Sequence, residues 1–277
     1  MTYIKKLIQI TTQSTFVIVF IFFSTLNAKN LDKFTKGDNI SDYFSGIILL
    51  NESKYEESFN YLKKLNGLED THLSFSSKYL YSLVNSGNFN NAFNYSKKLE
   101  RDGKGSFETD IILGVFYLKN QKFNLSNKYF EKAKRRGSRS TFDNFISQSL
   151  LFWSNLDIND INKSKASFEK LDQRFNNLKK IQNVFLNCFL GNKKTSLLFE
   201  ELVTDKKIDF SRYYYFYAKY LESIGEKNKA KKIIISSLNK FPRNLLLNQY
   251  KFDLETNENN FEFNCSNKND VVAEILY

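Results

Sequence analysis

The sequence has very few of the residues on which most enzymes and metal sites depend. Its 277 residues include a single histidine, His72, and only two cysteines, Cys188 and Cys265. One histidine and two distant cysteines do not provide the ligand spacing of a zinc site. The sequence also contains no glycine-rich phosphate loop and no serine-nucleophile motif. We therefore predict a protein that is not an enzyme and that binds no metal and no cofactor.

Proline and glycine are also scarce, with one proline and 10 glycines in the chain. All-β folds use both residues in their many turns, so this scarcity favours helices joined by short connections. Two cysteines are too few for a disulfide framework. We interpret Cys188, in the apolar segment VFLNCFL, as an inert core residue. Cys265 lies in a polar segment and is a candidate exposed thiol.

The chain is basic, with a formal net charge of +11 that comes mostly from lysine. Lysine richness alone is weak support for nucleic-acid binding, because arginine is the residue favoured for bidentate phosphate recognition. We expect no nucleic-acid partner. The densest basic run covers residues 132–139 and has two interpretations: a patch for phosphate, lipid headgroups or an acidic partner, or the last turn of a helix that ends before Gly137. We favour the helix end.

The N-terminus has the features of a targeting segment. Lys5 and Lys6 precede an apolar stretch that is densest from Phe16 to Phe23, and the small residue Ala28 follows. This order predicts a signal peptide over residues 1–28 and a periplasmic or exported protein. The alternative is an uncleaved anchor in the inner membrane, because residues 7–26 carry no charge and are long enough to span. In that case the N-terminal segment alone would contact the membrane.

Three segments repeat at a fixed interval. Tyr55, Phe89 and Phe123 lie 34 residues apart, and each is followed three places later by a small residue: Ser58, Ala92 or Ser126. A period of 34 with this content is the signature of stacked helix–turn–helix repeats. Two helices of one repeat approach closely only where a side chain is small, so we expect these small residues to be buried at helix crossings. We expect turns at residues 51–53, 85–88 and 119–121.

With these motifs the chain resembles the tetratricopeptide repeat family. Gly225, Ala230 and Pro242 match the turn glycine, the crossing alanine and the terminal proline of a further repeat. Two degenerate repeats lie between, one pairing helices near 142–156 and 160–171 and the other pairing 175–190 with 195–203. The resemblance covers about residues 39–256 and looks like an exported bacterial type. It implies an all-α, right-handed superhelical solenoid of about six antiparallel helix pairs.

We divide the chain into three parts on this basis: the signal peptide or anchor at 1–28, the helical solenoid at 29–256, and residues 257–277. The last part begins as a polar loop and ends in the start of a further, incomplete helix, with Asn269 or Asp270 as its N-cap. Because no second helix follows, we interpret the chain as incomplete or as lacking its next repeats.

The resemblance also implies where a partner would bind, because the first helix of each pair lines the concave face in this family. Leu50 and Leu118 fall on or near that face, and the remaining positions form the candidate peptide groove: Tyr43, Ile47, Tyr81, Val84, Ile111, Val115, Trp153 and Tyr215. We expect Tyr81, Val115 and Trp153 to be partly exposed there.

We therefore predict a non-catalytic interaction scaffold of the bacterial cell envelope that binds peptide or helical segments of a protein partner. One alternative is the repeat arm of a larger envelope enzyme whose catalytic part is missing from this chain. Another is a binder of anionic surfaces that uses the excess of lysine.

Overall fold

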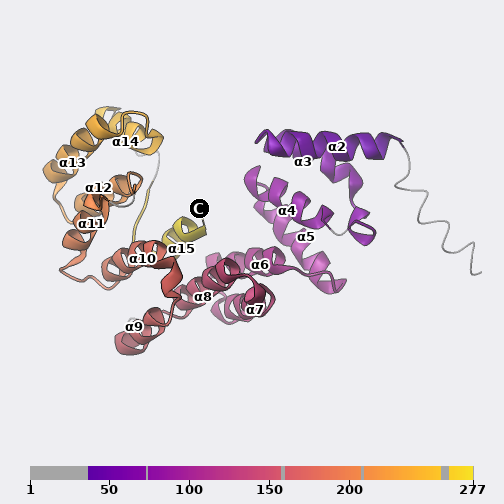
Figure 1. Ribbon diagram of the computed structural model, residues 1–277, viewed down its shortest axis with the longest axis horizontal. Helices are drawn as coiled ribbons and strands as arrows, with labels where there is room; N and C mark the ends of the chain where they lie inside the picture. The colour runs from indigo at the N-terminus through magenta and orange to yellow at the C-terminus, as the bar shows by residue number, and fades with distance from the viewer. Residues whose placement is uncertain (1–36, 73, 157–159, 207–208, 257–261, 277) are drawn as a thin grey trace, which may run out of the picture. The chain divides into compact units, whose positions relative to one another are not determined.

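The computed structural model describes residues 37–72, 74–156, 160–206, 209–256 and 262–276, and within these ranges the protein is all-helical without a strand. The predicted signal peptide at 1–28 lies outside the described residues. The helices form two compact units, the first ending at Lys104 and the second beginning at Gly105. Figure 1 labels the helices of both units.

Over its described residues, 37–72 and 74–104, unit 1 contains four α-helices and two short 3₁₀ turns. Each α-helix packs against the next one in the chain. The 3₁₀ turns at Lys63–Leu65 and Leu68–Asp70 fall between the second and third helices. The α-helices are α2 (Gly37–Asn51), α3 (Tyr55–Leu62), α4 (Phe75–Asn85) and α5 (Phe89–Arg101).

Unit 2 continues the pattern of consecutive packing, with contacts between α6 and α7, α7 and α8, α10 and α11, α11 and α12, and α12 and α13. Together with unit 1, this arrangement agrees with the predicted all-α repeat solenoid. The α-helices of unit 2 are α6 (Phe107–Lys119), α7 (Phe123–Arg136), α8 (Thr141–Asn155), α9 (Ile161–Glu169), α10 (Asn176–Phe189), α11 (Thr195–Thr204), α12 (Tyr213–Ser223), α13 (Lys227–Lys240), α14 (Leu245–Thr256) and α15 (Lys268–Leu276).

The turns between paired helices share one backbone geometry. A residue with positive φ follows the first helix of five pairs: Ser53, Gly87, Gln121, Gly191 and Gly225, at φ values of 60°, 74°, 58°, 62° and 85°. In each turn the N–H of the next residue donates to the carbonyl five positions earlier, as in Glu226 to Leu221 at 2.8 Å. This is the hydrogen bond of a Schellman motif, which ends a helix with a left-handed residue. The three turns expected at 51–53, 85–88 and 119–121 are confirmed.

The small residues of the repeat are buried in the core of their units. All four that the sequence predicts at crossings are fully buried: Ser58, Ala92, Ser126 and Ala230. At two of these places the facing helix contributes a glycine, because a Cβ added to Gly46 would come within 2.6 Å of Leu62, and one added to Gly114 within 2.3 Å of Phe130. These two contacts therefore have no room for a larger side chain.

The two degenerate repeats are present as helices at the expected places. The pair predicted near 142–156 and 160–171 corresponds to α8 and α9, and the pair predicted near 175–190 and 195–203 corresponds to α10 and α11. Ser164 and Phe168 on α9 are buried, as their place in the pattern requires, whereas Ile161 at the start of α9 is exposed.

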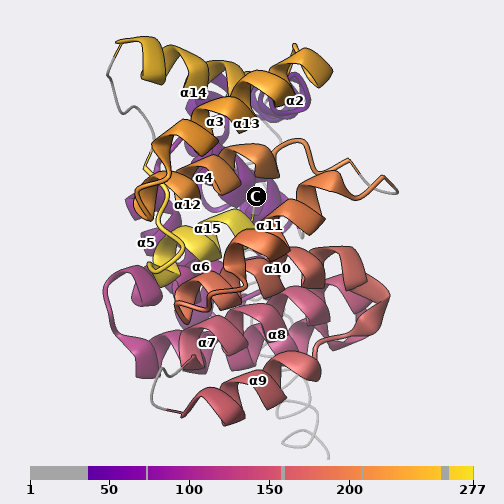
Figure 2. The same cartoon turned by 90° about the vertical axis from the view of Figure 1, so that its left-hand side faces the viewer.

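The C-terminal helix α15 starts at Lys268, slightly before the expected N-cap. The side chain of Asn267 accepts a hydrogen bond of 3.0 Å from the N–H of Asn269 and so caps the first turn. α15 packs against α8 and α10, far back in the chain, and Figures 1 and 2 both draw it beside α10. The described helices include none that is long and apolar enough to cross a membrane.

Candidate interaction surfaces

In unit 1 the predicted groove positions lie on α2 and α4. Tyr43, Ile47 and Val84 are half-buried, and Tyr81 is 51% exposed. The expectation that Tyr81 would be partly exposed is thus confirmed. Its ring packs edge-on against Tyr55 at 5.9 Å, which fixes it next to the turn between α2 and α3.

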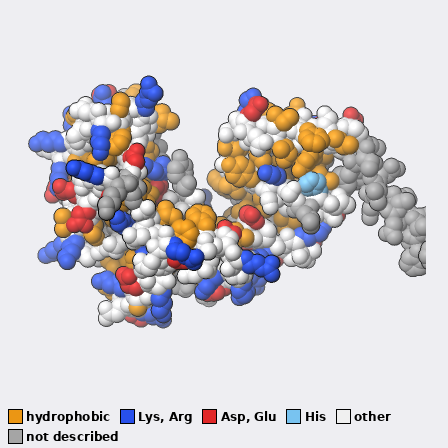
Figure 3. All heavy atoms as spheres, viewed as in Figure 1, with side chains coloured by type: hydrophobic (Ala, Val, Ile, Leu, Met, Phe, Trp, Pro, Cys, Tyr) orange, Lys and Arg blue, Asp and Glu red, His pale blue; other side chains and the backbone are white. Residues whose placement is uncertain are grey.

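An exposed apolar stripe on α2 was not included in the groove assignment. Ile40, Phe44 and Ile48 are 49%, 59% and 56% exposed. They are spaced four residues apart, so they lie on one side of the helix. Figure 3 shows hydrophobic side chains gathered on this unit. The four-residue spacing of these side chains is visible in the sequence, but the repeat pattern assigned the neighbouring positions Tyr43 and Ile47 to the groove instead.

In unit 2 the predicted groove positions divide into two classes. Ile111 and Val115 on α6 are half-buried against the core, as expected for Val115. Trp153 and Tyr215 are fully buried. The expectation of an exposed Trp153 is therefore wrong, and Tyr215 does not line an open surface either.

The burial of Trp153 has a clear structural reason. Its indole N–H donates to the side-chain oxygen of Gln182 on α10 at 3.2 Å, and its ring meets Phe152 at 5.3 Å and Phe189 at 6.1 Å. Trp153 thus joins α8 to α10 through packing and a satisfied hydrogen bond. Tyr215 packs edge-on between Phe216 and Tyr250, and burial raises the pKa of its phenol.

The C-terminal segment, Glu262–Leu276, lies against the first helices of successive pairs. Besides the contacts of α15 with α8 and α10, the ring of Phe263 meets Phe185 of α10 at 5.3 Å and Phe216 of α12 at 4.5 Å. Val271 and Val272 are fully buried in the same core. The sequence predicted the helix but not its docking site.

A disulfide bond holds this segment in place. It joins Cys188 in α10 to Cys265, whose Cα atoms are 5.8 Å apart across 77 residues of sequence. Cys265 is buried, so its interpretation as an exposed thiol is wrong, and Cys188 is a bonded core residue rather than an inert thiol. A pair of cysteines behind a predicted export signal was the available hint, because disulfides persist in oxidising compartments.

Polar contacts anchor α15 at both ends. The Arg212 guanidinium donates to both oxygens of the buried Glu274 carboxylate, at 2.8 Å from Nε and 2.7 Å from Nη2. Burial and this neighbouring carboxylate raise the pKa of Tyr213. At the other end the Lys268 ammonium donates to the carbonyl of Leu156. The bidentate pair between Arg212 and Glu274 is of a type that forms strong hydrogen bonds, and its geometry specifies one position of α15 on this surface.

The basic run at 132–139 ends α7, as favoured. Lys134, Arg135 and Arg136 occupy its last turn, and Gly137 begins the following 3₁₀ turn. Arg136 also pairs with the fully buried carboxylate of Asp110 at 3.3 Å. Part of this positive charge therefore stabilises unit 2 rather than serving a ligand.

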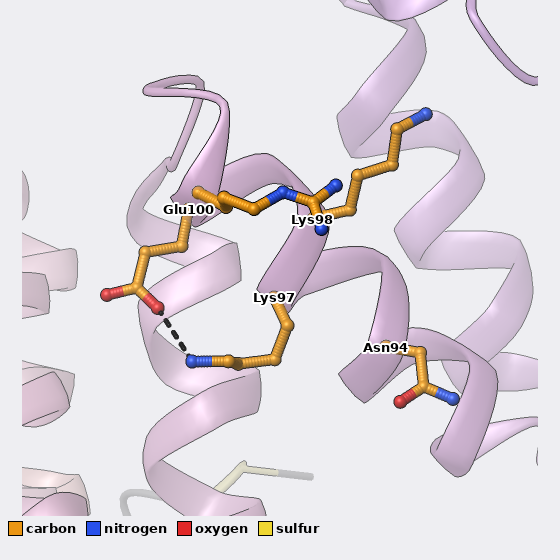
Figure 4. Close-up of a pocket in the computed structure, with 5 residues that line it drawn as sticks. Asn94, Lys97, Lys98 and Glu100 are labelled. Atoms are coloured by element: carbon orange, nitrogen blue, oxygen red, sulfur yellow. Dashed lines mark hydrogen bonds and ion pairs between the residues drawn. The ribbon is translucent and has the colours of Figure 1, made fainter.

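A shallow hollow in unit 1 is lined by α5 alone (Figure 4). Lys97 and Glu100 lie there as an ion pair at 3.3 Å, beside Asn94, Lys98 and Arg101. Walls from one helix do not enclose a ligand, so this hollow lacks the form of a small-molecule site. In the part of the chain that the structure describes, no group of three or more His, Cys, Asp or Glu residues is placed to hold a metal ion.

Comparison with protein-family models gives no match to this chain, and comparison with curated proteins gives none either. Functional interpretation therefore depends on the surfaces described above.

Proposed function

We propose that the protein is a non-catalytic interaction scaffold of the bacterial cell envelope that binds helical or peptide segments of a protein partner. In this proposal it is a right-handed, tetratricopeptide-like solenoid of antiparallel helix pairs. The Schellman turns and the buried small residues at a 34-residue interval support that architecture.

One observation carries the proposal: α8 and α10 already hold a helical segment of the same chain, α15, and Arg212 at the N-cap of α12 pairs with it. A surface that accommodates an amphipathic helix through aromatic packing and one buried ion pair has the chemistry of helix-in-groove recognition.

Unit 1 adds an open surface for a partner. Ile40, Phe44 and Ile48 on α2, together with Tyr81 on α4, remain largely exposed. Contiguous exposed apolar surfaces often mark interaction sites, and aromatic residues are frequent binding anchors.

The disulfide supports export, because such bonds are rare in reducing compartments. The predicted signal peptide agrees with it. We therefore place the scaffold in the periplasm or outside the cell, with the inner-membrane anchor as the alternative.

Site-specific photocrosslinking in the producing cell tests this function. A photoreactive phenylalanine analogue at Tyr81 is compared with the same analogue at Asn91, an exposed residue of α5. We expect discrete protein adducts from position 81 that disappear when Phe44→Asp is added, and none from position 91. Equal adducts at both positions, or none at position 81, would contradict the proposal.

A further inference from the structure

We propose that the face formed by α8, α10 and α12 binds an amphipathic helix of a partner protein, and that α15 is its intramolecular competitor, locked in place by the Cys188–Cys265 disulfide. This inference rests on the proposed function and deepens it, because it names the class of partner segment and the control of one binding face.

The first argument is the one-sided burial of α15. Val271 and Val272 are fully buried and Ile275 packs against the core, whereas Ala273 and Leu276 are exposed. A partner helix with the same buried positions, two adjacent β-branched residues and a further aliphatic one turn later, would fill the same space.

The second argument is charge complementarity. Arg212 donates two hydrogen bonds to Glu274, whose side chain is only 6% exposed. Without a carboxylate in this place, the partly buried guanidinium would lose the two hydrogen bonds that Glu274 accepts. The face therefore selects a helix that carries an acidic residue three positions after the first buried valine.

The third argument is that α15 depends on its docking site. It has nine residues, and isolated helices shorter than about 12 to 15 residues are marginal in water. Once displaced, α15 would lose its helical structure and uncover the core residues that Val271, Val272 and Ile275 pack against. A partner helix with the same buried positions would cover them again.

The disulfide determines whether such an exchange can occur. It binds the C-terminal segment covalently to α10. After the disulfide is cleaved, the only covalent link between this segment and the rest of the chain is the backbone that follows α14. A dithiol reductant supplies the two electrons and two protons that turn the disulfide into the thiols of Cys188 and Cys265, and is itself oxidised to a disulfide. In the oxidised chain α15 therefore covers the face formed by α8, α10 and α12. In the reduced chain a partner helix can compete with α15 for this face.

The test uses the full chain and a fluorescent synthetic peptide of residues 262–276 with serine at position 265, so that the peptide forms no disulfide. Fluorescence anisotropy measures its binding to the oxidised protein and to the variant Cys188→Ser/Cys265→Ser/Glu274→Arg. The Glu274→Arg change weakens the chain's own α15, so that the face is available to the peptide. Circular dichroism confirms that helix content is largely kept.

We expect the peptide to bind the triple variant at least tenfold more tightly than the oxidised chain. A control peptide carrying Glu274→Arg should lose at least tenfold in affinity for the triple variant. Equal binding by oxidised and variant chains, or equal binding of both peptides, would overturn the proposal. The crosslinks expected from Tyr81 arise in unit 1, so the two proposals fail separately.

Discussion

The Ser58 hydroxyl donates a hydrogen bond of 2.8 Å to the carbonyl oxygen of Gly46, across the contact between α3 and α2. Both residues are buried, and a Cβ on Gly46 would come within 2.6 Å of Leu62. The same two positions recur 34 residues later as Leu80 and Ala92, where the small residue is on the second helix only.

Enlarging a crossing residue should destabilise unit 1. Ala92→Leu forces a larger side chain into a fully buried site, so we expect the free energy of unfolding to fall by about 1–3 kcal/mol through overpacking. Urea unfolding followed by circular dichroism measures this loss. Asn91→Leu, at the exposed neighbouring position, is the control and should change stability by less than about 0.5 kcal/mol. A neutral Ala92→Leu would contradict the register of the repeat.

Substitutions at two left-handed turn residues should change the stability of the protein in opposite directions. Gly225 has φ +85° with nothing within 4 Å of an added Cβ, so Gly225→Ala should cost about 1 kcal/mol through the backbone alone. Gln121 adopts φ 58° without being glycine, and Gln121→Gly should stabilise the protein by up to about 1 kcal/mol. Thermal melting compares both with Gly37→Ala, a site with equal space and no positive φ, which should not lose stability.

Unit 1 should lose stability in acid through Glu69. Burial would raise the pKa of this carboxyl, but hydrogen bonds from Lys98 and from the backbone N–H of Gly67 outweigh it and lower the pKa below its usual range. Because folding lowers the pKa, the stabilisation is present above the unfolded value of about 4.3 and is lost as pH falls through the folded value.

The measurement for Glu69 is urea unfolding of Glu69→Gln at pH 7 and near pH 3. We expect a loss of about 1–3 kcal/mol relative to the unmodified chain at pH 7, shrinking at the lower pH. Glu57→Gln, exposed on α3, serves as the control and should show no such dependence. A loss that is the same at both pH values would refute the role of the ionised carboxylate.

Trp153→Ala should act on stability. A fully buried indole that packs on two rings and bonds to Gln182 leaves a large cavity when removed, so we expect a loss of about 3–5 kcal/mol. Phe142→Ala on the same helix, at a 51% exposed ring, should cost less than about 1 kcal/mol. Chemical denaturation distinguishes them, and similar small losses for both would argue that Trp153 is not in the core.

Arg136→Ala should destabilise unit 2 by about 1–3 kcal/mol, because it leaves the fully buried Asp110 without its guanidinium partner. The Arg136 side chain is 37% exposed, so solvent screening keeps the loss below that of a fully buried pair. Arg135→Ala, next to it in the basic run, is the control. An equal, small effect of both substitutions in differential scanning calorimetry would mean that the run is only a solvated surface.

Local pattern in the sequence was sufficient for the helices, turns and crossings, because each depends on residues within one 34-residue repeat. For example, the small size and 34-residue spacing of Ser58, Ala92 and Ser126 predicted that they are buried. Contacts between distant segments have no such local pattern in the sequence. Two examples are the ion pair of Arg212 with Glu274, 62 residues apart, and the disulfide of Cys188 with Cys265.

The error at Trp153 has the same origin. The repeat pattern assigns it to the first helix of a pair and hence to an open groove. Whether that groove is open depends on what else the chain places against α8 and α10, and here α15 packs against both helices.

The disulfide also has a mechanical consequence. It joins α10 to the start of the C-terminal segment, so α11, α12, α13 and α14 all lie inside a closed covalent loop. A force that pulls on the two ends of the chain is carried through the sulfur–sulfur bond and bypasses these four helices. Over the sequence separation of 77 between the cysteines, roughly 260 Å of extended chain is withheld from stretching until the bond is reduced.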